Sequence, residues 1–147
     1  MPRPGYIICS ASYAEDRTTN LLSLLQIVEC FDGIPITTSS DGKQIIPMGT
    51  TISAISVWVK EEGDSSTDMF ETQINCIAPD GSEFFTTPII QFSFGEGGGF
   101  YRTIAKDIAI PGFPVLGTYL VGSKVRRVGE TVWMSQQPFP FVVRLKA

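Results

Sequence analysis

The sequence predicts an all-β domain, an antiparallel β-sandwich of the immunoglobulin-like or C2-like kind with about eight or nine short strands. Two observations carry this prediction. Apolar and polar residues alternate with a period of two along much of the second half of the chain, as in strands that bury one face. Turn residues interrupt the alternation roughly every 8–12 residues, which is typical of sandwiches and barrels. A small β-barrel is the alternative. The sandwich is preferred because each strand offers one apolar face and no ligand-lined lumen is evident.

Residues 70–78 show the alternation most clearly, and they end in the turn sequence Pro79-Asp80-Gly81-Ser82. Proline favours the first central position of a turn, aspartate tolerates the next, and glycine supplies a positive φ. These residues therefore predict a hairpin whose second strand covers 83–87. Pro88 has no N–H to donate to a ladder, so this strand lies at a sheet edge or bends there.

Two further strands are predicted at 90–94 and 100–110, separated by Gly95-Glu96-Gly97-Gly98-Gly99. Charged residues interrupt the apolar face of the second strand, so we expect that face to be buried toward one end only. It comprises Phe100, Arg102, Ile104, Lys106, Ile108 and Ile110.

The rest of the second half predicts alternating turns and strands. Pro111-Gly112-Phe113-Pro114 predicts a turn before a strand at 117–125, and Gly129-Glu130 predicts another before 132–134 and a final strand at 141–145. The residues expected to face the core are Tyr119, Val121, Ser123 and Val125 on the first of these strands, and Phe141, Val143 and Leu145 on the last.

The first half of the chain is less regular. Residues 6–13 predict a strand with Ile7, Cys9 and Ala11 on one face, followed by a polar loop that ends at Asn20. Residues 21–31 fit both a helical stripe and a strand. We favour the strand, because no helix C-cap follows and the neighbouring segments are strands.

Residues 52–60 predict a strand whose alternation breaks once, which indicates a β-bulge near Ala54. No linker, internal repeat or low-complexity tract divides the chain. We therefore expect a single domain over residues 1–147.

The charge balance disfavours binding to nucleic acid. The chain has 11 Lys and Arg against 15 Asp and Glu, a net charge of −4, whereas a nucleic-acid surface needs a basic patch that neutralises phosphates. The basic residues of the second half are interpreted as solvated strand faces. They are Lys124, Arg126 and Arg127, with Arg144 and Lys146 further along the chain.

No catalytic group stands out in the sequence. Histidine is absent, which removes the usual partner of a serine or cysteine nucleophile and the commonest metal ligand. The three cysteines, Cys9, Cys30 and Cys76, form no CxxC pair and lie in apolar stretches. We interpret them as reduced core residues, with a disulfide between two of them as the alternative. We expect no enzyme, no metal and no cofactor.

The start of the chain, Met-Pro-Arg-Pro-Gly, begins no signal peptide, and its apolar stretch at 6–11 is short. The longest candidate membrane span, residues 21–31, is interrupted by polar residues, so we expect no membrane span. The expected location is cytoplasmic.

Several landmarks resemble a family of small bacterial and phage-associated β-sandwich proteins described as a domain of unknown function. They are the opening strand at 6–11, the segment 22–27 after a polar turn, the strand that enters Ala78-Pro79-Asp80-Gly81, and the turn at 110–114 that leads into 116–121. The resemblance covers nearly the whole chain. It implies a β-sandwich without an enzymatic activity and transfers no catalytic residue.

Two loops carry chemistry-bearing residues and are interpreted as ordinary loops. The glycine tract at 95–99 lacks the Lys-Ser/Thr pair and the helix that a phosphate-binding loop needs. Glu61, Glu62, Asp64 and Asp68 offer carboxylate oxygens to Ca²⁺, but their spacing matches no calcium motif, so a solvated loop is favoured over a metal site.

The predicted interaction edge is Pro138, Phe139 and Pro140. Alternating prolines block regular strand pairing, and an exposed Phe139 there would mark a contact surface. The alternative is a bent final strand with Phe139 buried. Trp58 and Trp133 are interpreted as core or sheet-face residues.

The expected function is protein–protein contact without enzymatic activity, as a homo-oligomer or as a component of a larger complex. The alternative is a small-ligand-binding module with a pocket between the sheets or at the loops that carry Asp80 and Phe113.

Overall fold

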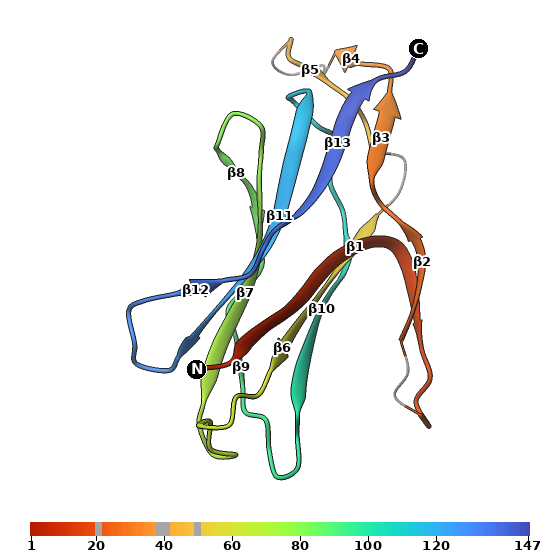
Figure 1. Ribbon diagram of the computed structural model, residues 1–147. Coiled ribbons are helices and arrows are strands. Elements are labelled where there is room, and N and C mark those ends of the chain that lie inside the picture. The colour runs from red at the N-terminus through yellow and green to blue at the C-terminus, as the bar shows by residue number, and fades with distance from the viewer. Residues whose placement is uncertain (20–21, 38–41, 49–50) are drawn as a thin grey trace.

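The computed structural model describes residues 1–19, 22–37, 42–48 and 51–147, and all regular structure in these residues is strand. The all-β prediction is confirmed. The strands form two larger sheets and one small hairpin (Figure 1). Within the described chain the two larger sheets share no strand pair, so the fold is sandwich-like and is not closed into a barrel. None of the described segments is a helix long and apolar enough to cross a membrane.

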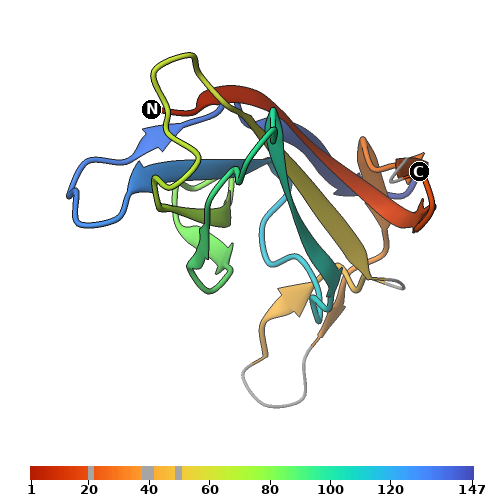
Figure 2. The same ribbon diagram turned by 90° about the horizontal axis from the view of Figure 1, so that it is seen from below.

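The first sheet, called sheet A, has four antiparallel strands. Their order is β10 (Phe100–Ile108), β6 (Ile52–Val59), β1 (Arg3–Glu15) and β2 (Leu22–Ile27). Figure 2 shows β10, β6 and β1 side by side. In Figure 1, β1 arches at its middle and then descends together with β2. We call this descending pair of strands the arm.

The second sheet, called sheet B, has five strands in a row and two short strands beside them. The row is β3 (Cys30–Gly33), β13 (Phe139–Leu145), β11 (Gly117–Arg127), β7 (Phe70–Ile77) and β8 (Glu83–Thr86). The short strands are β12 (Met134–Ser135) beside β11 and β9 (Ile90–Phe92) beside β7. Only β3 and β13 pair in parallel among the described strands. The small hairpin consists of β4 (Ile36–Thr37) and β5 (Gln44–Ile45).

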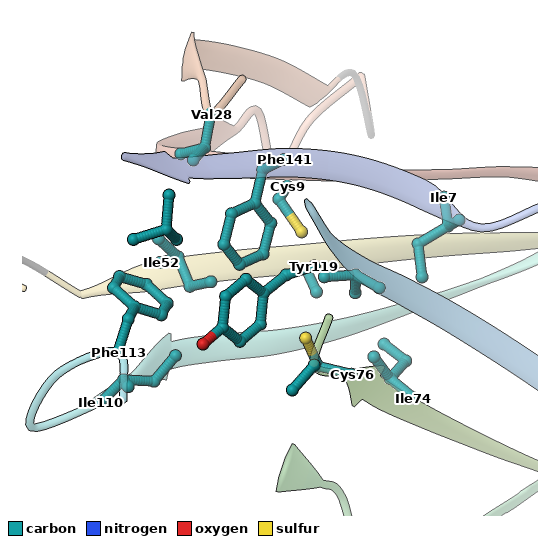
Figure 3. Close-up of a cluster of buried hydrophobic side chains, with 14 of the residues drawn as sticks. Ile7, Cys9, Val28, Ile52, Ile74, Cys76, Ile110, Phe113, Tyr119 and Phe141 are labelled. Atoms are coloured by element: carbon teal, nitrogen blue, oxygen red, sulfur yellow. The ribbon is translucent and has the colours of Figure 1, made fainter. Parts of the chain in front are cut away.

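The core lies between the sheets and is rich in aromatic rings. Tyr119 stacks on Phe141 with ring centroids 5.3 Å apart, and Phe113 meets both rings edge-on (Figure 3). The Tyr119 hydroxyl donates a hydrogen bond to the Val115 carbonyl at 2.9 Å, which satisfies the one polar atom that this buried ring carries. The residues predicted to face the core from 117–125 are all buried.

A second cluster of buried side chains surrounds Trp58, which is fully buried as predicted. Its indole N–H donates to the Thr72 hydroxyl at 3.0 Å, and the Thr72 hydroxyl donates to the Lys124 carbonyl at 3.0 Å. Each polar atom of this chain of hydrogen bonds therefore has a partner, as burial requires.

The hairpin predicted at Pro79-Asp80-Gly81-Ser82 is confirmed. The N–H of Gly81 donates to the carbonyl of Ala78, Gly81 has a φ of +84°, and the Asp80 carboxylate accepts the Ser82 N–H at 3.0 Å. After β8 the chain bends around Pro88, and β9 then pairs with the other half of β7. The expectation that Pro88 lies at an edge or a bend is thus correct.

The residues predicted to form one face at 100–110 do not share a face, because β10 contains a β-bulge. The expectation that this set is buried toward one end only is correct, since Ile110 is buried and Phe100 is exposed. Phe100 lies on the outer face of sheet A, and Thr103, from the opposite set, is buried on the inner face. Between the pairs Ala105–Ala54 and Ile108–Ile52, β10 has one residue more than β6. Asp107, in this stretch, has a φ of +46°. An extra residue reverses which side chains face inward, so Ile110 is buried although Phe100 is exposed.

The bulge predicted near Ala54 is wrong in its position. Ala54 pairs with Cys9 on one side and with Ala105 on the other without a break. The extra residues belong to the neighbouring strands, in β10 after Ala105 and in β1 between Pro4 and Ile7. The break in alternation that suggested a bulge arises because β6 buries side chains on both of its faces.

The other predictions for the first half are largely correct. Residues 6–13 lie in β1, with Ile7 and Cys9 buried. The strand preference for 21–31 is correct in the described residues, where β2 covers Leu22–Ile27 and β3 begins at Cys30. Residues 20–21, the end of the predicted loop and the first residue of this segment, lie outside the described residues.

The segment predicted as a turn at 111–114 carries the chain from sheet A to sheet B. Its Phe113 forms a bridge with Ile46 and is buried in the core. In the last strand, Phe141 and Val143 are buried as predicted, whereas Leu145 is 54% exposed. Leu145 pairs with Gly33, which has no side chain to cover it.

The cysteine prediction is correct for two of the three residues. Cys9 and Cys76 are buried and free, and burial raises the pKa of each thiol to about 12. Cys30 is also free but exposed, so its assignment to the core is wrong. It belongs to edge strand β3, where Phe31 turns inward to Phe141 and leaves Cys30 on the outer side.

Candidate interaction surfaces

The predicted edge at Pro138, Phe139 and Pro140 lies on sheet B. Phe139 pairs with Val121 and packs against the core, whereas Pro140 pairs with Leu120 and is exposed on the outer face. The expectation that the prolines prevent regular pairing is wrong for the side of β13 that faces β11. On the other side, β3 pairs only from Val142 onward, so both prolines precede that ladder.

A hollow of about 200 Å³ lies beside these prolines on the outer face of sheet B. Gly122 lies in its lining and pairs with Asn75, while Leu120 pairs with Ile77 one step along the same face. The Asn75 side chain lies beside Gly122, where a Cβ would be 3.2 Å from Asn75 Oδ1. The lining comprises Asn75, Ile77, Leu120, Gly122, Ser123, Ser135, Gln136 and Pro138.

Farther along the same face, two cations of β11 pack on the indole ring of Trp133. The Arg126 guanidinium carbon lies 4.3 Å, and the Lys124 ammonium 4.8 Å, from the centroid of the indole. Both are cation–π contacts. Trp133 is half-buried on the outer side of the sheet, so it is a sheet-face residue, as predicted.

The same end of sheet B holds an ion pair. Arg126 Nε donates to Glu71 Oε2 at 2.6 Å, and Gln91 donates to the other carboxylate oxygen at 3.1 Å. Hydrogen bonds from Gln91 and Arg126 hold the pKa of Glu71 below its usual value. The basic residues are thus partly neutralised by their own sheet, in agreement with their interpretation as strand faces.

The outer face of sheet A is different, because apolar residues run along its middle. Ile55, Val57 and Val59 of β6 all point outward. Ile55 lies between Ile8 of β1 and Ile104 of β10 in one row across the sheet. An antiparallel sheet with one solvated face normally alternates apolar and polar residues, so β6 departs from that pattern.

The arm covers part of this apolar face. Its end is tied to β10 by an ion pair between Glu15 and Arg102, and Lys106 lies 5.9 Å from the ring centroid of Tyr13. Both cations project from the outer side of β10. The arm therefore lies over the outer face of sheet A, and Ile55 is 0% exposed although it points away from the core.

A groove of about 500 Å³ remains beside the arm, whose Leu22 lines it. Two aromatic side chains border it and are exposed: Tyr6 by 47% and Phe100 by 54%. Its lining comprises Tyr6, Leu22, Val57, Val59, Gly99, Phe100 and Arg102. The sequence reasoning missed this surface. The available signal was β6 itself, in which apolar residues occupy both alternating sets.

Two carboxylates of the acidic loop at 61–68, Asp64 and Asp68, are bound by other groups of the same chain. Asp64 is buried; its Oδ1 accepts a hydrogen bond from the Met1 ammonium at 2.7 Å and its Oδ2 accepts the Glu61 N–H at 3.1 Å. Asp68 forms an ion pair with Arg127 at 3.3 Å. The expectation of a solvated loop is therefore wrong for Asp64. In the described chain, no three or more Cys, Asp or Glu side chains are grouped to hold a metal ion.

The glycine tract at 95–99 forms the turn between β9 and β10. Gly95 and Gly97 have φ values of +68° and +72°, which explains the glycines. A strand follows the tract where a phosphate-binding loop would have a helix.

A further cavity, of about 480 Å³, lies between edge strand β8 and the end of β10. Its lining is mostly apolar and includes Phe84, Phe85, Ile108, Ile110 and Pro114. The opening therefore leads toward the aromatic core from between the two sheets.

Comparisons with protein-family models, with curated proteins and with solved structures found no match.

Proposed function

We propose that this domain acts without enzymatic activity, through protein–protein contact, and that the outer face of sheet A is its contact surface. The observation that carries the proposal is the central strand β6, which presents Ile55, Val57 and Val59 outward. Strands that are apolar on both faces are found where both faces are covered.

The arm covers the part of this surface that contains Ile55 and Val57, which are 0% and 6% exposed, so the uncovered part is the end at Val59. Tyr6 and Phe100 remain exposed on either side of Val57 and Val59, and an aromatic pair around an apolar groove is typical of the centre of a protein interface. A second copy of the chain or another protein of the same complex would cover it.

The test is the oligomeric state of the purified chain, measured by size-exclusion chromatography with light scattering over increasing protein concentration. We expect the wild-type chain to self-associate, the Phe100→Glu variant not to, and the Val132→Glu variant to do so still. Val132 is exposed in the loop between β11 and β12, away from sheet A. Equal melting temperatures of the two variants would show that folding is intact.

If the wild-type chain is monomeric throughout, self-association is wrong and the partner must be another protein. Cross-linking from a cysteine introduced at Val59, in extract of the native host, would then give one protein adduct that Phe100→Glu removes. The absence of both self-association and such an adduct would refute the proposal.

A second candidate function is the binding of a small apolar ligand in the cavity between β8 and β10. Its volume of about 480 Å³ is within the range of about 300–1,000 Å³ that small-molecule sites occupy. The test is the fluorescence of the apolar dye 1-anilinonaphthalene-8-sulfonate. Saturable binding to one site, lost when Ala109→Phe fills the cavity, would support it; binding unaffected by that substitution would count against it.

A further inference from the structure

The arm is a hairpin that leaves sheet A at a sharp boundary within β1. Residues 3–10 of β1 pair with β6, and from Ala11 onward β1 pairs with β2 alone. After β2, the N–H of Val28 donates to the Cys9 carbonyl at 3.0 Å, and the chain then enters β3 of sheet B. Figure 1 shows the arm on the far side of β10 and β6 from β7. Both chain connections of the arm therefore lie at the same end of it.

This boundary combines two unfavourable features. Ala11 and Gln26 lie opposite each other there, and the β1–β2 register, which runs without a shift on both sides, contains no pair between them. Gln26 has a φ of +57°, a left-handed conformation that is unfavourable for residues other than glycine. Ser10 is fully buried, and its Oγ has no hydrogen-bond partner among the described residues, which also costs stability. We call Ala11 and Gln26 the hinge of the arm, because the strain lies where the arm begins and ends.

The arm is held on sheet A by contacts that do not involve the hinge. Glu15 forms an ion pair with Arg102, and Lys106 lies 5.9 Å from the ring centroid of Tyr13. Beneath the arm, Ile55 is fully buried. An arm that detaches exposes this apolar face, which then has to be covered again. The surface that already fits it in shape and charge is an arm, and the arm of a second copy can make the same contacts.

We propose that two copies of this chain exchange their arms, so that the arm of each covers the outer face of sheet A of the other. The proposal rests on the contact surface proposed above and names a second copy as its occupant. Exchange keeps the contacts between arm and sheet and lets the hinge straighten, which makes the swapping of an identical element a low-cost route to a dimer. The groove beside the arm then has walls from both chains, since Leu22 belongs to the arm whereas Tyr6 and Phe100 belong to the rest of sheet A.

The direct test is a cross-link between the arm of one chain and the sheet of another. One chain carries Tyr13→Cys and heavy isotopes, and the other carries Lys106→Cys. Both also carry Cys30→Ser, so each presents one accessible thiol. The chains are mixed in urea just below the unfolding transition, returned to buffer and treated with a short bis-maleimide. We expect mass spectrometry to find an adduct of one heavy and one light chain, and none when Lys124→Cys, on sheet B, replaces Lys106→Cys.

A chain with a locked arm separates arm exchange from the proposed function. In a Cys30→Ser chain that carries both Tyr13→Cys and Lys106→Cys, the same reagent at low protein concentration ties the arm to its own sheet. The groove at Tyr6 and Phe100 stays open in this chain, because neither substituted residue lines it. We expect the locked chain to remain monomeric at concentrations at which the unlocked chain dimerises, as measured by size-exclusion chromatography with light scattering.

Substitutions at the hinge should shift the equilibrium in opposite directions. Gln26→Gly removes the penalty of the left-handed conformation from the closed chain and is expected to raise the dimer dissociation constant about tenfold. Gln26→Val places a β-branched residue there and is expected to lower it. Ser10→Ala removes the unpartnered hydroxyl and should raise it. Ser12→Ala is the matched control, because Ser12 is exposed on the same strand, and should leave the dissociation constant unchanged.

The outcomes distinguish the two proposals. If the locked chain dimerises as the unlocked chain does and no adduct joins arm and sheet, arm exchange is wrong and the contact surface stands. If the unlocked chain is monomeric throughout and gives no mixed adduct, arm exchange and self-association are both wrong. A mixed adduct that forms equally with Lys124→Cys would show unspecific association and would also overturn the proposal. Equal dissociation constants for Gln26→Gly, Gln26→Val and wild type would overturn the hinge as the source of the exchange.

Discussion

The outer faces of the two sheets differ far more than their inner faces. Both central strands bury every second residue in the core, but β6 carries Ile55 and Val57 on its other side, whereas β11 carries Gly122 and Lys124. Ile55 is 0% exposed and Leu120 of β11 is 39% exposed. The difference is produced by the arm, which covers sheet A and has no counterpart among the described residues over sheet B.

Substitutions on the two outer faces should therefore affect folding stability to different extents. A side chain on the outer face of sheet A contributes to folding wherever the arm covers it, because its apolar surface is removed from water within the same chain. A side chain on the outer face of sheet B keeps more of its surface in water, as Leu120 does with 39% exposed, so a substitution there should affect folding less. The following changes test that division.

The largest effect is expected from placing a charge on each outer face. Ile55→Asp buries an unpaired carboxylate beneath the arm and should lower the free energy of unfolding by about 3–5 kcal/mol. Leu120→Asp places the same charge at the exposed position and should cost less than about 1 kcal/mol. Urea unfolding followed by circular dichroism measures both. Similar losses in the two variants would show that the arm does not cover Ile55 in solution.

The second effect concerns the attachment of the arm. Arg102→Ala removes the ion pair with Glu15 and should cost about 1 kcal/mol, because the pair is only partly buried. Hydrogen exchange should become faster in β2 and in the end of β1, and unchanged in β11. Arg144→Ala, which removes the exposed pair with Asp32 on sheet B, is the control. Unchanged exchange in the arm would mean that other contacts hold it.

The alternation of apolar and polar residues correctly predicted those strands that have one face in the core and the other face outside it. β7 and β11 each bury every second side chain, and a period of two describes that arrangement directly. The hairpin at Asp80 and Gly81 was predictable for the same kind of reason, since turn geometry depends on the residues of the turn itself. In these places local chemistry and tertiary packing agree.

The errors arise where distant parts of the chain decide the environment. The bulge at Asp107 is set by pairing with β6 and reverses the inward face of β10. The exposure of Cys30 depends on parallel pairing with β13, more than 100 residues later. Neither pairing is visible in the local pattern.

The candidate sites show the same limit. The position of Pro138 and Pro140 was predictable from their chemistry, but the hollow beside them also requires Gly122 and Asn75 from other strands. The apolar outer face of sheet A was signalled by β6. The broken alternation in β6 was interpreted as a bulge, because the arm that covers the second face of this strand cannot be predicted from the local sequence.

A smaller effect is expected from the ion pair on sheet B. Hydrogen bonds from Gln91 and Arg126 lower the pKa of Glu71 from its ordinary value of 4.5. A lowered pKa means that ionised Glu71 stabilises the fold above the unfolded-state pKa, and that this contribution disappears as pH falls through the folded-state pKa. The melting temperatures of wild type and Glu71→Gln should therefore differ at pH 7 and converge as the pH falls through the folded-state pKa of Glu71, which lies below 4.5. In an Arg126→Gln background the difference at pH 7 should shrink; a pH-independent difference would contradict this account.

The smallest effect on stability is expected at Cys30, the exposed cysteine, whose thiol should react more readily than the two buried thiols. Burial raises the pKa of Cys9 and Cys76 to about 12, so both thiols are protonated and shielded at pH 8, whereas Cys30 is exposed on the outer side of β3. Ellman's reagent should therefore label one thiol of the folded chain and all three in guanidinium chloride, and Cys30→Ser should abolish the labelling of the folded chain. Because Cys30 is exposed and its thiol donates a hydrogen bond to the exposed Asp32 at 3.3 Å, labelling should change the free energy of unfolding by less than about 0.5 kcal/mol. Labelling of a second thiol under native conditions would show that the sheets separate more readily than the packing of Tyr119 and Phe141 between them implies.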